Sequence, residues 1–187
     1  MKTLIIVSHP DFAHSIANQR IVFRVKEALP EVELRHLDTL YPDYKIDVAA
    51  EQEVLLGADL LVFQHPLYWF SVPASLKQWM DKVLHRGFAY GEGGDHLKGK
   101  QFIHSVTMGG PQESYSPEGR NHYTLPELLR PFELMRNLTG MHHAGTVCSY
   151  GNTFVADSGH SRAEIHATAD DHAAHLVSCI RKVAKGS

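Results

Sequence analysis

Residues 59–84 read DLLVFQHPLYWFSVPASLKQWMDKVL, and three kinds of segment follow one another in this stretch. The run from Asp59 to Gln64 is short, aliphatic and aromatic, which is typical of a buried strand. The residues up to Pro73 hold three consecutive aromatic side chains between two prolines. From Ala74 to Leu84 the apolar residues return with helical spacing. A strand, a loop and a helix in this order begin a parallel βαβ unit.

The same alternation continues along the rest of the chain. Further strands are predicted at Leu4 to Ser8, Val32 to Leu37, Gln101 to Thr107 and Ala144 to Tyr150. Further helices are predicted at Ile16 to Leu29, Val48 to Ala58, Leu125 to Leu138 and Arg162 to Val183. Pro131 is expected to kink or interrupt its helix, and the polar alternation of Val32 to Leu37 places that strand nearer the sheet edge. The pattern predicts an α/β fold: a five-stranded, doubly wound parallel sheet with helices on both faces.

Length and composition set the class of protein. The 187 residues fit one domain, 1–187, and 43% hydrophobic with 21% charged residues is ordinary for a folded chain. A formal net charge of −3 argues against a nucleic-acid partner, because phosphate binding needs a clustered positive surface. Cys148 and Cys179 are expected to be reduced core residues. With neither a signal-peptide pattern nor an apolar run of about 20 residues, we expect a cytoplasmic location.

Three strand ends are followed by unusual segments, and ligands of open α/β sheets bind at such ends. After the first strand, residues 9–18 contain neither G-x-G-x-x-G nor G-K-[ST], so the common nucleotide fingerprints are missing. Ser15 at a helix start, with Asn18 three residues later, can hold a phosphate on the free amides of the helix. Ser15 can equally be a plain N-cap. This segment alone leaves the two interpretations even.

The other two segments supply flat, rigid surfaces. Tyr68, Trp69 and Phe70 cannot all point inward, so at least one is expected to contact a ligand or another chain. A hydrophobic plug under a helix or a dimer partner is the alternative, and we favour a ligand. After the fourth predicted strand, Gly109 and Gly110 allow close backbone approach to a planar ring or a phosphate. The long non-periodic stretches, Gly87 to Gly99 and Gly109 to Tyr123, are of the kind that carries function.

Two other classes of site are less well supported. The histidines His166, His172 and His175 invite a metal hypothesis, but no strand-end carboxylate accompanies them and the stretch is polar. We therefore expect them to be solvated surface residues, with no metal site. A Ser-His-Asp hydrolase would need a G-x-S-x-G turn, which the sequence lacks.

Phe63 to Lys77, followed by Trp79, Asp81 and Val83, resembles the signature of the NAD(P)H:quinone oxidoreductases, a flavodoxin-like family. The segments Gly87 to Gly91 and Thr107 to Tyr115 fall where that family places them. Within the family, residues 40–43, 46–47, 51–53 and 130–134 are most similar to the ancillary subunits of the Kef glutathione-gated potassium efflux systems. The resemblance covers nearly the whole chain.

The resemblance implies a homodimer with flavin sites at the subunit interface. It implies a set of flavin contacts, which places the phosphate on His9, Ser15, Ile16, Ala17 and Asn18, and the ring on Pro66, Leu67, Tyr68, Trp69, Phe70, Thr107, Met108, Gly109 and Gly110. Tyr115 would stand beside the ring and assist hydride transfer. The family places a histidine six positions later, where this chain has Asn121 followed by His122, and both are candidates for that role.

The implied activity is two-electron reduction of a quinone or related electrophile by NAD(P)H. FMN is the expected cofactor because the chain stops soon after its last helix, and FAD stays open. A regulatory subunit of a potassium efflux membrane protein, held at the inner face of the membrane by that partner, is the alternative from another class, and a one-electron carrier is a third. The electron acceptor and the choice of NADH or NADPH are open.

Overall fold

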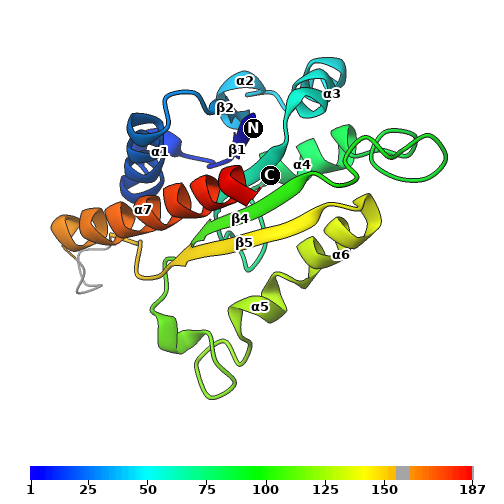
Figure 1. Ribbon diagram of the computed structural model, residues 1–187. Coiled ribbons are helices and arrows are strands. Elements are labelled where there is room, and N and C mark those ends of the chain that lie inside the picture. The colour runs from blue at the N-terminus through cyan, green and yellow to red at the C-terminus, as the bar shows by residue number, and fades with distance from the viewer. Residues whose placement is uncertain (155–160, 187) are drawn as a thin grey trace.

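The computed structural model describes residues 1–154 and 161–186. Five parallel strands form one sheet in the order β2-β1-β3-β4-β5 (Figure 1). Their bounds are Thr3–Val7 for β1, Glu33–His36 for β2, Leu60–Pro66 for β3, Gln101–Thr107 for β4 and His142–Ser149 for β5. All five predicted strands are confirmed within a few residues, and β2 lies at an edge of the sheet as its alternating pattern indicated.

Helices cover both faces, as the doubly wound prediction requires. Helix α1 (Ile16–Ala28) and helix α7 (Arg162–Gly186) lie side by side across one face (Figure 1). The other face carries α3 (Val48–Gly57), α4 (Ala74–Val83), α5 (Leu125–Leu128) and α6 (Arg130–Thr139). The sheet separates two hydrophobic cores, one on each face. Because side chains alternate along a strand, Ile5 and Val7 of β1 enter the core beneath α1 and α7, while Leu4 and Ile6 enter the core on the opposite face.

Local sequence signals explain where helices begin and end. The segment predicted at Leu125 to Leu138 is broken into α5 and α6, with Pro131 in the first turn of α6. Proline fits there because the amide it lacks would have no partner in the helix. Thr124 and Glu127 form a capping box at the start of α5. The short helix α2 (Leu37–Leu40) was not predicted, since four residues carry too little periodicity.

A buried carboxylate links β2, α3 and α4. Glu51 of α3 is fully buried, and its Oε2 accepts a hydrogen bond from Trp79 Nε1 at 2.9 Å. Its Oε1 accepts from the Tyr41 hydroxyl at 2.6 Å and from the Arg35 guanidinium. This environment raises the pKa of Tyr41 to about 12, with burial as the largest cause. Every polar atom that the cluster buries therefore has a partner, which is the condition for tolerating a charge in a core.

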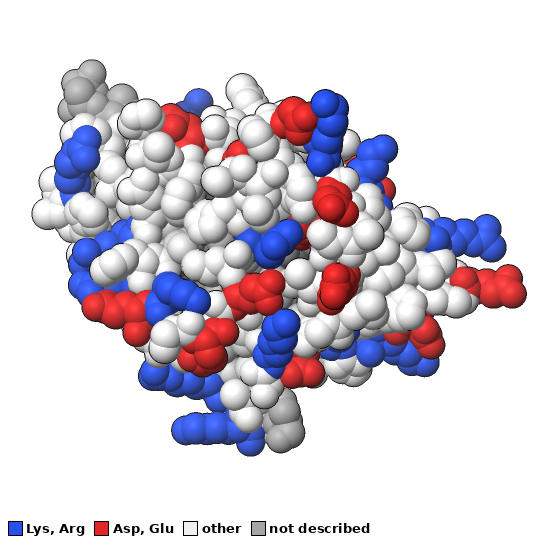
Figure 2. Space-filling model, turned by 90° about the horizontal axis from the view of Figure 1, so that it is seen from above, with Lys and Arg blue, Asp and Glu red and all other residues white. Residues whose placement is uncertain are grey.

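The surface carries charges of both signs. On the face seen in Figure 2, lysines and arginines are interspersed with aspartates and glutamates.

Cys148 and Cys179 are free thiols and only partly buried, so they border the cores rather than lie within them. Among the described residues no helix is both long and apolar enough to cross a bilayer.

Candidate functional site

Backbone hydrogen bonds bring three strand ends together at one edge of the sheet. Ser8, just after β1, donates its amide to Gln64 O of β3 at 3.1 Å. Leu67, just after β3, donates to Thr107 O at the end of β4 at 2.8 Å. Met108 donates to Ser149 O of β5 at 2.8 Å. The three segments that the sequence singled out therefore lie next to one another at this edge.

The start of α1 is prepared for an anion. Ser15 Oγ accepts from the Asn18 backbone amide at 3.2 Å and from Asn18 Nδ2 at 3.1 Å, and Ser15 O accepts from the Gln19 amide. Ile16 and Ala17 precede the first intrahelical bond, so their amides are free for an external acceptor. The N-cap and phosphate interpretations of Ser15 are thus compatible. The positive end of the helix dipole favours a negative group at this position.

His9 lies beside this helix start, half-buried. Its backbone amide donates to Asp38 Oδ2 at 2.8 Å, and its Nδ1 accepts from the Asp11 amide at 3.1 Å. Burial lowers the pKa of the imidazole against the opposing effect of Asp38 and Asp11. With Nδ1 occupied as an acceptor, the hydrogen of the neutral ring lies on Nε2. His9 can therefore offer one neutral donor to an anion.

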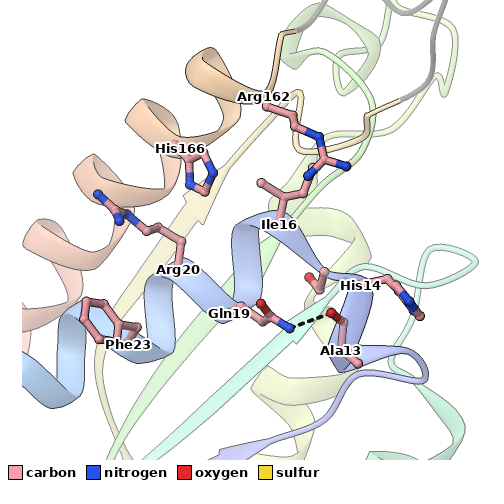
Figure 3. A pocket seen from close by; sticks show the side chains of 9 residues that line it. Ala13, His14, Ile16, Gln19, Arg20, Phe23, Arg162 and His166 are labelled. Atoms are coloured by element: carbon pink, nitrogen blue, oxygen red, sulfur yellow. Dashed lines mark hydrogen bonds between the residues drawn. The ribbon is translucent and has the colours of Figure 1, made fainter.

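A cavity of about 470 Å³ opens between α1 and α7 next to Ser15 (Figure 3). Its lining includes Arg20, Arg162 and His166, which Figure 3 shows on the two facing helices. Arg20 is held by Asp170 of α7 through two hydrogen bonds of 2.6 and 2.8 Å. The cavity joins the helix start, so an anion bound there has basic side chains within the same depression.

The aromatic segment after β3 is a two-residue turn. Tyr68 and Ser71 exchange backbone hydrogen bonds of 3.0 and 2.9 Å, and the residues between them, Trp69 and Phe70, have φ of 48° and 60°. Such a turn normally carries Asn-Gly, because the left-handed region is strained for other residues. All three aromatic side chains are exposed, Trp69 by 88%. The alternative of a plug under a helix of the same chain is therefore wrong, and the contact of at least one aromatic with a ligand or another chain stays a prediction.

The loop after β4 presents bare backbone next to a tyrosine. Thr107 and Met108 are buried, while Gly109 is exposed and a Cβ added there would overlap Thr153 Oγ1 at 2.1 Å. A Cβ at Gly110 would lie 3.6 Å from the Tyr115 ring. Burial raises the pKa of Tyr115, so its hydroxyl remains a donor near neutral pH. Gly109 is therefore required by the close approach of Thr153, and the backbone at Gly110 lies next to the Tyr115 ring without a side chain between them.

Asn121 and His122 lie in the same loop as Tyr115 but differ in their surroundings. The Asn121 amide donates to Ser114 O at 3.0 Å, which brings Asn121 back to the neighbour of Tyr115. His122 is exposed, has φ of 58°, and its Nδ1 lies 3.3 Å from Pro117 O. The chain thus folds residue 121 toward the tyrosine, while the His122 ring is tethered to the loop.

The expectation of three solvated histidines on α7 is wrong for one of them. His166 and His175 are exposed, but His172 is only 3% exposed. His172 Nε2 lies 2.7 Å from Ser105 Oγ, and Nδ1 lies 2.8 Å from Ser149 Oγ. Among the described residues no group of three or more potential ligands could hold a metal ion. The polar neighbours of His172 in sequence hid its position on the buried stripe of the helix.

A family model described as a flavodoxin-like fold matches residues 1–176. The chain belongs to this family. The ancillary protein KefG of a glutathione-regulated potassium-efflux system from Cronobacter sakazakii is 45% identical over 141 residues, which are 75% of this chain and 76% of that protein.

Two solved structures of similar proteins cover almost the whole chain. One is a general stress protein 14 from Treponema denticola in complex with FMN, with a TM-score of 0.85 and 35% identity, covering 96% of this chain and 99% of that one. The other is an NADPH-quinone reductase from P. pentosaceus, with a TM-score of 0.75 and 31% identity, covering 92% and 98%.

Proposed function

We propose that the protein is an FMN-dependent NAD(P)H oxidoreductase that reduces quinones or related electrophiles by two-electron hydride transfer in a ping-pong cycle. The observation that carries the proposal is the meeting of an anion-ready helix start with an aromatic turn and a bare glycine backbone at one sheet edge. A similar fold binds FMN in the Treponema protein, and another is named an NADPH-quinone reductase. The proposal draws on these two proteins because this chain belongs to the same family, whereas a shared fold alone would not support a shared function.

The residues present fit the two ends of a flavin mononucleotide. The amides of Ile16 and Ala17, the Ser15 hydroxyl and His9 Nε2–H are all donors, as a phosphate requires. Asn18 supports Ser15 from within the fold. The ring would lie against residues 66–70 and 107–110, where Leu67 N and Thr107 O join the two loops. FAD remains the alternative, with its second phosphate directed into the basic cavity of Figure 3.

Bound FMN supplies the redox chemistry, and the chain supplies orientation and hydrogen bonds. The backbone amides around Gly109 and Gly110 can stabilise negative charge that develops on the ring. The Tyr115 hydroxyl, held beside Gly110, is positioned to donate as that charge grows. Asn121 and His122 are the candidates for moving a proton at the same end of the site, and residue 121 lies nearer to the tyrosine segment.

We also propose that a second copy of the chain completes the site. Trp69 and Phe70 next to the ring position are exposed, as are Leu134 and Leu138 on the outer face of α6. Aromatic side chains of this size gain most when a partner removes them from water. A homodimer with the ring between the subunits would bury the aromatic turn. Sedimentation of the purified protein tests this, and a monomer with FMN bound would reject it.

A second candidate function rests on the similarity to KefG. As an ancillary subunit, the protein would bind the potassium efflux membrane protein at the inner face of the membrane, with quinone reduction secondary. Without that partner we place it in the cytoplasm, where NAD(P)H is available and free thiols such as Cys148 persist. Co-purification with an efflux protein would favour the regulatory function.

The deciding experiment is an absorption spectrum of the protein after reconstitution with FMN, followed by anaerobic NADPH or NADH and then menadione. The oxidoreductase proposal expects the flavin bands to bleach with the nicotinamide and to return with the quinone, with little semiquinone. A stable semiquinone would favour a one-electron carrier. Flavin binding without bleaching would favour the regulatory subunit. Protein that binds no flavin would overturn the proposal.

A further inference from the structure

A row of buried polar side chains crosses the sheet beneath α7 and ends at the start of α1. Each is less than 10% exposed and each is hydrogen-bonded to the next, and the members are, in order, Asn18, Gln64, Ser105, His172 and Ser149. Buried polar groups are costly unless every donor finds an acceptor. The row therefore has to be read as one network, in which the direction of each hydrogen bond depends on its neighbours.

The direction is set at the β5 end. Asn152 Nδ2 lies 2.8 Å from Ser149 O and 3.2 Å from Met108 O, and carbonyls only accept. The amide nitrogen of Asn152 is thereby fixed, and its two hydrogens are shared among these two carbonyls and Ser149 Oγ at 3.0 Å, so Nδ2 offers the Ser149 hydroxyl no acceptor. His172 Nδ1, at 2.8 Å, is the acceptor that the described residues place next to the Ser149 hydroxyl, so we assign the hydroxyl hydrogen to this contact. A neutral imidazole has one N–H, so the hydrogen of His172 lies on Nε2.

The same direction continues to α1. His172 Nε2–H donates to Ser105 Oγ at 2.7 Å, and the Ser105 hydroxyl donates to Gln64 Oε1 at 2.6 Å. Gln64 Nε2 donates to Asn18 Oδ1 at 2.9 Å. Asn18 Nδ2 donates to Ser15 Oγ and to Thr107 Oγ1, each at 3.1 Å. Along the path from Ser149 to Ser15, each donor thus points toward the start of α1.

The consequence appears at the anion site. Ser15 Oγ accepts from both the amide and the side chain of Asn18, so its own hydrogen is left to point outward into the cavity that Ser15 lines. If the chain ran in the opposite direction, Asn18 Oδ1 would face Ser15. The Ser15 hydrogen would then turn inward, and a lone pair would face the anion.

We propose that His172 is a positioning residue whose single tautomer sets the direction of this chain, so that Ser15 donates to the phosphate of the bound flavin. The inference rests on the proposed flavin function. His172 lies on α7 and does not line the site itself; it acts through Ser105, Gln64 and Asn18.

The test compares FMN with riboflavin, which lacks the phosphate. His172→Leu and Ser105→Ala each break the chain between Asn152 and Asn18, and His175→Leu changes an exposed histidine of the same helix as a control. We expect the dissociation constant for FMN, measured by flavin fluorescence, to rise roughly 10- to 100-fold in the first two variants, the range of a hydrogen bond to a charged group. Riboflavin binding should change less than threefold, and His172→Gln, which keeps a donor and an acceptor, should recover part of the loss.

Nitrogen NMR of the flavin-free wild-type protein gives a readout that does not depend on flavin. We expect His172 to carry its hydrogen on Nε2, and the Nδ1–H form would overturn the proposal. Equal losses of affinity for FMN and riboflavin would show a merely structural role and would also overturn the proposal. The proposal also fails if Ser105→Ala leaves the ratio of the FMN and riboflavin dissociation constants unchanged. Wild-type protein that binds neither flavin rejects the proposed function itself. If the wild-type protein binds FMN but the variants keep the wild-type ratio of FMN to riboflavin dissociation constants, only the role of His172 is rejected.

Discussion

Tyr115 packs against Tyr150 with ring centroids 5.5 Å apart and an interplanar angle of 54°. Tyr150 follows β5, so the catalytic candidate is supported by the strand next to the one that carries its loop. This packing holds the Tyr115 ring beside Gly110 without using its hydroxyl.

Tyr115→Phe should therefore keep the ring in place and remove only the donor. We expect the rate at which NAD(P)H bleaches bound FMN to fall about 10- to 100-fold, because one donor to developing charge is lost. The dissociation constant for FMN should stay within about threefold. Stopped-flow absorbance and fluorescence titration measure the two quantities. Unchanged bleaching kinetics would remove Tyr115 from the mechanism.

The strained turn allows function to be separated from stability. Replacing Trp69 by Asn and Phe70 by Gly supplies the residues that this turn prefers. We expect the free energy of unfolding of the flavin-free protein to rise by about 1–2 kcal/mol. FMN binding should weaken about tenfold as the aromatic surface is lost. Urea unfolding and fluorescence titration at one protein concentration provide the comparison. A loss of stability together with intact FMN binding would mean that the aromatic residues serve the fold alone.

Removal of the buried carboxylate should be among the most damaging single changes. Glu51→Ala leaves Arg35 charged in a partly buried position and takes the acceptor from Trp79. The expected loss is about 3–5 kcal/mol of unfolding free energy. Glu53→Ala, two positions away and exposed, is the matched control and should change stability by less than about 0.5 kcal/mol. Similar urea midpoints for the two variants would contradict the buried network.

Acid should weaken the fold before the carboxylates titrate. Burial lowers the pKa of His65 to about 4 and of His172 to about 3, while unfolded histidines titrate near 6.5. Between pH 6.5 and 4 the unfolded chain binds protons that the folded chain does not. The unfolding free energy should therefore fall with decreasing pH, by about 1.4 kcal/mol per pH unit for each buried histidine.

Urea unfolding at pH 7, 6 and 5 measures this slope. His172→Gln should reduce the slope by the share of one histidine, whereas His175→Gln on the exposed side of α7 should leave it unchanged. Stability that is flat between pH 7 and 5 would show that these imidazoles are not held neutral in the fold.

The parts of the fold that periodicity controls were predictable from sequence. The buried strand β1 contains the continuous aliphatic run Leu4 to Val7. Pro131 marks the break between α5 and α6 because its ring does not tolerate a preceding helical turn. The long helix α7 was predicted, yet the burial of His172 was not. Its neighbours Asp170 and Asp171 made the stretch look polar, although Asp171 is exposed and Asp170 pairs with arginines of α1.

In the candidate site too, some residues were predictable from local sequence signals, whereas the contacts that support them were not. Ser15, the aromatic turn and the Gly109 loop follow strand ends and carry local signals, and the structure brings them together. Their support comes from pairs far apart in sequence, such as Ser105 with His172, which no local pattern reveals. The burial of Glu51 depends on Arg35 and Trp79 in the same way.

The pairing of α1 with α7 also constrains how the chain can fold during synthesis. Arg20 of α1 meets Asp170 of α7 across 150 positions of sequence. In a nascent chain that has already made β1 and α1, the apolar stripe of Ile21 and Val25 lacks the part of its core that α7 supplies until residues 162–186 leave the ribosome. One side of the sheet stays open for most of translation, so this stripe is where a holdase chaperone would have its longest opportunity to bind.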